Sequence, residues 1–97
     1  MTEVTVAEAE KIHEYEVSFL DLNTNETARF AVQGDATLQQ TWDEAYTKLG
    51  EARRESDVLE SRSGEVLTAH LGQTIRYVRE HVVRDLKFQI HGEQGGA

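Results

Sequence analysis

The sequence predicts a small α+β domain in which one helix packs across a β-sheet. Apolar residues alternate with polar ones in two neighbouring segments, a helical apolar pattern follows them, and a further alternating segment lies near the end of the chain. A chain of 97 residues fits one domain with one hydrophobic core. We expect this domain at residues 15–91, after a flexible acidic arm at 1–14 and before a flexible tail at 92–97.

The first two strands are predicted as a hairpin. Apolar residues at every second position from Tyr15 to Phe19 have the period of a half-buried strand, and the alternation returns between Ala28 and Val32. The segment 23–26 between them contains asparagine, which favours turns because its side chain hydrogen-bonds the nearby backbone. We therefore expect two strands joined by this turn.

A helix is predicted over residues 38–49. Thr37 and Gln40 have the spacing of a capping box, in which both side chains bind free amide groups at the start of a helix. Apolar residues at positions 38, 42, 45 and 49 form one stripe, and Gly50 suits the left-handed position that ends many helices. Trp42 belongs to this stripe, so we interpret it as a core aromatic rather than a ligand-stacking residue.

The charged segment 51–57 is predicted to be a solvated loop or a frayed extension of the helix. Glu51 and Glu55 are expected to form a solvated face, because a small domain offers no cleft that would perturb their ionisation. Arg53 and Arg54 are expected to solubilise the chain rather than bind phosphate.

The remaining elements complete the predicted sheet. A strand is expected to begin at 58–59 and a short returning strand at 66–67, because the Ser-Gly pair at 63–64 is typical of a tight turn. A short helix or 3₁₀ turn is expected within 75–83, and alternation at 86–90 predicts the last strand. The predicted core residues are Val17, Phe19, Phe30, Leu38, Trp42, Leu49, Leu86, Phe88 and Ile90.

The order of these elements is strand, strand, helix, strand, short strand and final strand. A chain that must bury one face of such a sheet does so most simply with the helix lying diagonally across it. The first and last strands are then central and parallel. This arrangement is the β-grasp, and it is the fold that we predict.

The predicted order resembles ubiquitin over about residues 15–96. The most similar stretch runs from 58–67 through 74–75 and 86–90 to the glycines at 95–96, and it matches in spacing and order more than in identity. The resemblance implies a protein modifier with the ubiquitin-like fold.

The end of the sequence carries a second part of the resemblance. A double glycine, Gly95-Gly96, followed by Ala97 is similar to the precursors of ubiquitin-like proteins, including those of bacterial operons with their own activating enzyme, conjugating enzyme and metal-dependent peptidase. This implies a cytoplasmic protein that is joined to target proteins by an isopeptide bond at Gly96 once Ala97 is removed. An activating enzyme, a conjugating enzyme and a processing peptidase are the implied partners. The familiar modifier tail has basic residues before its glycines, whereas residues 91–94 here are His-Gly-Glu-Gln.

Two glycines suit the chemistry that the resemblance implies. Glycine has no Cβ, so an extended glycine backbone can pass through a narrow channel and approach a nucleotide or a catalytic cysteine closely. Ala97 would block that passage until it is removed. Glycine-rich ends are also often merely disordered, but here the pair follows a predicted β-grasp strand after a short spacer.

Composition excludes several other function classes. The chain has 18 acidic and 10 basic residues, for a net charge of −8, which disfavours binding to nucleic acid and to anionic membranes. It has no cysteine and no apolar stretch long enough to span a bilayer. The four histidines are scattered without metal-ligand spacing, and no catalytic set is recognisable, so we expect neither an enzyme nor a cofactor.

Two alternatives to a modifier stay open. One is a sulfur carrier of similar fold, in which the glycine carboxylate becomes a thiocarboxylate, although such carriers normally end at the second glycine. The other is an interaction module that is never conjugated and that binds a partner through its sheet. We expect a monomer, and the sequence leaves open whether chains form on Lys11, Lys48 or Lys87.

Overall fold

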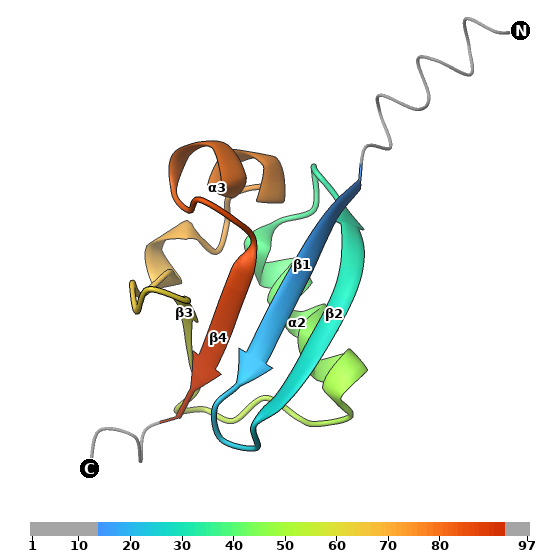
Figure 1. Ribbon diagram of the computed structural model, residues 1–97, viewed down its shortest axis with the longest axis vertical. Helices are drawn as coiled ribbons and strands as arrows, with labels where there is room; N and C mark the ends of the chain where they lie inside the picture. The colour runs from blue at the N-terminus through green and yellow to red at the C-terminus, as the bar shows by residue number, and fades with distance from the viewer. Residues whose placement is uncertain (1–13, 93–97) are drawn as a thin grey trace, which may run out of the picture.

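The computed structural model describes residues 14–92, which form one mixed sheet with helices packed against it (Figure 1). The four strands lie in the order β2-β1-β4-β3, so the first and last strands of the described chain are central. β1 and β4 are parallel, whereas β2 and β3 are antiparallel to their neighbours. The elements are β1 (Glu14–Asp21), β2 (Glu26–Gln33), α2 (Leu38–Leu49), β3 (Val58–Ser61), the 3₁₀ helix η1 (Thr68–His70), α3 (Ile75–His81) and β4 (Lys87–His91).

The β1–β2 hairpin forms as predicted and begins one residue earlier. Glu14 already pairs with Gln33, so β1 starts inside the segment expected as the arm. The turn closes where the Asn25 N–H donates to the Asp21 carbonyl over 2.6 Å. Asn25 has a φ of 67°, a left-handed conformation that asparagine tolerates better than most residues. The rest of the predicted arm lies outside the described residues.

Helix α2 has both of the predicted caps. The Thr37 hydroxyl accepts from the Gln40 N–H over 3.1 Å, and the Thr37 N–H donates to the Gln40 side chain over 2.9 Å. Gly50 ends the helix with a φ of 73°, which costs a glycine little. The helix lies behind β1 and β2 in Figure 1 and therefore covers one face of the sheet.

The core lies between α2 and that face of the sheet. Of the predicted core residues, Phe30 and Leu49 are half-buried and pack against the core, while the others are buried. Phe19 and Phe88 sit side by side on the two central strands, with their ring centroids 4.9 Å apart. The second half of the chain closes the core with Leu59, Leu67, Ile75 and Val78.

One detail of the prediction is wrong. The expected strand at 66–67 is reduced to a single bridge between Glu60 and Val66, because η1 begins at Thr68 and turns the chain away from β3. The short helix or 3₁₀ turn expected within 75–83 is confirmed as the α-helix α3. Its start is anchored where the Ile75 N–H donates to the Ala36 carbonyl over 2.8 Å. Within residues 14–92, no helix is long and apolar enough to cross a membrane.

Candidate functional site

The candidate site is the end of the molecule from which the C-terminal segment leaves the sheet. β1 and β4 are parallel neighbours, so their C-terminal ends lie at the same end of the sheet, where Asp21 pairs with Ile90. The Leu22 N–H donates to the Ile90 carbonyl over 2.8 Å, and His91 pairs with Val58 of β3 on the other side. The last strand is therefore held on both sides up to its end. The predicted site residues Gly95, Gly96 and Ala97 follow shortly in the sequence and lie outside the described residues.

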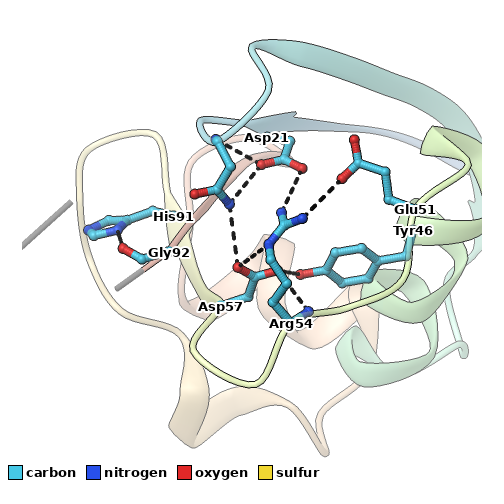
Figure 2. Close-up of polar contacts among 8 residues, drawn as sticks. Asp21, Tyr46, Glu51, Arg54, Asp57, His91 and Gly92 are labelled. Carbon is cyan, nitrogen blue, oxygen red and sulfur yellow. Dashed lines mark hydrogen bonds and ion pairs between the residues drawn. The ribbon is translucent and has the colours of Figure 1, made fainter. Parts of the chain in front are cut away.

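A polar network lies at this end of the sheet (Figure 2). Its centre is Arg54, which points between Asp21 at the end of β1 and Asp57 just before β3. Arg54 Nη2 is 3.2 Å from Asp21 Oδ2, and Arg54 Nε is 3.3 Å from Asp57 Oδ1. Both aspartate side chains are completely buried, whereas the arginine side chain is 43% exposed. One guanidinium thus serves as counter-ion to two buried carboxylates and covers them on the solvent side.

The remaining carboxylate oxygens also have partners. The Tyr46 hydroxyl of α2 donates to Asp57 Oδ2 over 2.8 Å, and the Arg54 N–H donates to the same oxygen over 3.2 Å. The Asn23 N–H and side-chain amide donate to Asp21 Oδ1 over 2.9 and 3.0 Å. Each of the four aspartate oxygens is therefore satisfied, as burial of a charged group requires.

The pKa values of the two neighbouring carboxyl groups move in opposite directions. Burial by itself would raise the pKa of Asp21, but hydrogen bonds from Asn23 and from Glu51, and the charge of Arg54, bring it below its ordinary value. The hydrogen bond to Asp21, together with burial and the charge of Asp21, raises the pKa of Glu51. Asp21 therefore carries the negative charge, and Glu51 is the carboxyl that takes up a proton more readily.

Tyr46 and Arg54 are fixed as hydrogen-bond donors. Burial and the hydrogen bond to Asp57 raise the pKa of Tyr46 above its ordinary value, so its phenol stays protonated. Burial by itself would lower the pKa of Arg54, but the charge of Asp57 raises it. Neither group is suited to accept a proton at neutral pH.

His91 and Gly92, the last described residues, lie at the same end of the sheet as the network (Figure 2). The His91 Nδ1 is 2.8 Å from the Gly92 carbonyl oxygen, and its Nε2 is 3.6 Å from Glu60 Oε2. Glu60 is itself held by the Gln89 side-chain amide, which donates to it over 2.8 Å. His91 thus lies close to Glu60 of β3 and contacts the backbone of Gly92.

These contacts are suited to holding segments in place. The network joins the β1–β2 turn, the end of α2, and the loop before β3, and all of its members already bind one another. Within residues 14–92, no cluster of three or more histidine, aspartate or glutamate side chains is placed to hold a metal ion. We therefore interpret the network as a brace that fixes the position from which the tail departs.

Sequence reasoning missed this network. Glu51 is half-buried and Asp57 is buried, so the prediction of a solvated loop is wrong for these two residues. Arg54 is exposed as predicted, but its guanidinium also bridges two buried carboxylates. The prediction is right for Arg53 and Glu55, which are exposed. The one signal in the sequence is that aspartates stand at the end of the first strand and at the start of the third, where apolar alternation stops. That signal does not say which neighbouring arginine turns inward.

Comparison of the chain with protein-family models and with curated proteins gave no match. Its function is therefore to be inferred from the strand order, the network and the tail sequence. These three features all concern the same end of the molecule.

Proposed function

We propose that this protein is a modifier with the ubiquitin-like β-grasp fold, joined to target proteins through the Gly96 carboxylate after cleavage of the Gly96–Ala97 bond. The observation that carries the proposal is the central, parallel position of β4, with α2 across one face of the sheet and the double glycine shortly after the strand. This strand order is the one expected of a β-grasp. The brace supports the proposal because it fixes where the tail begins.

The position of the tail root matters because an enzyme that acts on the tail must bind both the domain and the tail. β4 pairs with β1 and with β3, and the Arg54 brace ties the segments around it together. A partner bound to this end of the domain would therefore find the residues after Gly92 at a defined starting point.

The proposed chemistry proceeds in three steps. The Gly96 carboxylate attacks the α-phosphate of ATP, which forms an acyl-adenylate and releases pyrophosphate. A cysteine thiolate of the activating enzyme displaces AMP to form a thioester. An amine of the target then displaces the thiolate and loses a proton, which leaves an amide bond. Absence of a side chain at Gly96 keeps its carbonyl carbon open to each nucleophile.

The proposal is tested with purified activating and conjugating enzymes, ATP and magnesium, on denaturing gels with and without reductant. Deletion of Ala97 should preserve the thioester and the product without a peptidase. Gly96→Asp should abolish both through steric and charge conflict in the channel. Gln94→Asp is the matched control, since it adds the same charge two residues earlier and should retain product.

Stability measurements separate this effect from misfolding. All three variants should unfold within about 0.5 kcal/mol of the parent, as expected of changes beyond the last strand. Equal product from Gly96→Asp and the parent would refute the proposal and favour an unconjugated interaction module. A product that carries sulfur in place of oxygen at Gly96, and is not transferred to any protein, would identify a sulfur carrier instead.

A further inference from the structure

The face of the sheet that α2 leaves uncovered carries a row of three polar side chains. Figure 1 looks onto this face, with β4, β1 and β2 side by side in front of the helix. Ser18 of β1 pairs with Arg29 of β2 on one side and with Lys87 of β4 on the other. Because paired residues in adjacent strands point to the same face, Arg29, Ser18 and Lys87 lie in line across the sheet.

The row lines a shallow hollow. Its volume is about 300 Å³, and Glu16 and Asp85 line it together with the three residues of the row. Ser18 is only 6% exposed, although it belongs to the uncovered face. Its small side chain forms the floor of the hollow, while the exposed Arg29 and Lys87 stand at either side.

The side-chain polar groups of the row have no partners within the described residues. The Ser18 N–H donates to the Leu86 carbonyl over 3.0 Å, but its hydroxyl makes no hydrogen bond with any part of the described chain. Neither Arg29 nor Lys87 forms an ion pair there, even though acidic side chains line the same hollow. Ser18, a residue only 6% exposed whose hydroxyl has no partner in the described chain, lies between two cations that form no ion pair there, an arrangement suited to a ligand.

The chemistry of the row identifies the ligand as a carboxylate. Cross-strand neighbours on one face stand about 5 Å apart, so one small anion above Ser18 is within reach of both cations. A carboxylate there would accept one hydrogen bond from the serine hydroxyl and charge-assisted bonds from Arg29 and Lys87. Its two oxygens offer enough lone pairs for all three donors.

The acidic side chains of the hollow favour a protein as the source of the carboxylate. Asp85 is engaged by the Lys87 N–H at 3.4 Å, and its charge and that of Glu16 oppose a doubly charged phosphate. They would instead attract a basic side chain next to the bound carboxylate. We propose that this hollow binds an aspartate or glutamate of a partner protein, with a lysine or arginine of the same partner beside it.

The proposed binding does not depend on conjugation, because the row lies on the sheet face and uses no residue of the tail. The test uses the full chain and follows backbone amide shifts by NMR. The probe is a blocked tetrapeptide, acetyl-Gly-Asp-Lys-Gly-amide, titrated at constant ionic strength to roughly 50 mM so that screening does not change. The neutral counterpart, acetyl-Gly-Asn-Gln-Gly-amide, and inorganic phosphate are titrated in parallel.

The Asp-Lys peptide should give saturable shifts centred on Ser18, Arg29 and Lys87, with a dissociation constant in the millimolar range. The neutral peptide should give none. Arg29→Gln should weaken binding at least fivefold and Ser18→Ala at least twofold, while Lys48→Gln, on α2 behind the sheet, should leave it unchanged. Thermal melts should show that all three variants stay folded.

Any one of three results would overturn the proposal. No saturable shift at these residues with the Asp-Lys peptide would exclude a carboxylate site on this face. Tighter binding of phosphate than of the peptide would assign the hollow to a different ligand. Equal loss of binding in Lys48→Gln and Arg29→Gln would show that only the general charge of the domain matters.

Discussion

The apolar core under α2 and the polar network at the tail end stabilise the protein in different ways. In the core, Phe19, Phe88 and Trp42 gain stability from area removed from water, and each contributes through many weak contacts. In the network, Asp21 and Asp57 are completely buried and depend on a few specific donors, with Arg54 shared between them. Loss of one core side chain leaves a cavity, whereas loss of the arginine leaves two charges without their counter-ion. We therefore expect the core to contribute most of the stability, and the network to fix the relative positions of the segments that it joins.

The largest effect is expected in the core. Phe88→Ala should lower the free energy of unfolding by about 3 to 5 kcal/mol, because the ring is completely buried and stacked on Phe19. Trp42→Ala should cost a similar amount. Leu22→Ala is the control, since Leu22 is 46% exposed and its loss should cost less than about 0.5 kcal/mol. Urea denaturation measures all three, and a small loss in both core variants would show that the core is wrongly assigned.

Two adjacent arginines, Arg54 in the network and Arg53 outside it, should contribute differently to stability. Arg54→Ala should cost about 2 kcal/mol, less than for a completely buried pair because its side chain is 43% exposed. Arg53 stacks 4.6 Å from the Trp42 ring centroid and pairs with the exposed Asp43, so Arg53→Ala should cost no more than about 1 kcal/mol. The same denaturation series measures both. Equal losses would mean that the network adds nothing beyond a surface ion pair.

The smallest effect is expected at Glu51 and should depend on pH. A raised pKa means that the fold favours the neutral carboxyl, so Glu51 contributes most below its ordinary pKa and loses that contribution as pH rises through the folded value. Glu51→Gln should therefore stabilise the protein at pH 7, by less than about 1 kcal/mol. The gain should shrink toward pH 4.5, where the parent itself takes up the proton. Melting curves at several pH values test this, and a gain that grew in acid would contradict the assignment.

The elements with a strong local signal were predictable from the sequence. The capping box at Thr37, the left-handed Gly50 and the alternation of both central strands are local features, and each lies where the sequence places it. The prediction of a strand at 66–67 was wrong because two apolar residues form too short a pattern to show that the chain turns away after Leu67. The brace could not be predicted, because Asp21, Tyr46 and Asp57 come from three elements and meet only when the sheet has formed. Local charge patterns do not distinguish Arg54 from Arg53.

The most direct test of the central claim is to find the bond to a target. Trypsin cleaves after Lys87, and residues 88–96 contain no lysine or arginine. A conjugate taken from cells that make the protein and digested with trypsin should therefore yield target peptides with a branch of residues 88–96, joined to a lysine through Gly96. Mass spectrometry of protein purified by an N-terminal affinity tag would detect this branch. Recovery of the chain only in free form, with the Gly96–Ala97 bond intact and no branched peptide, would contradict the account.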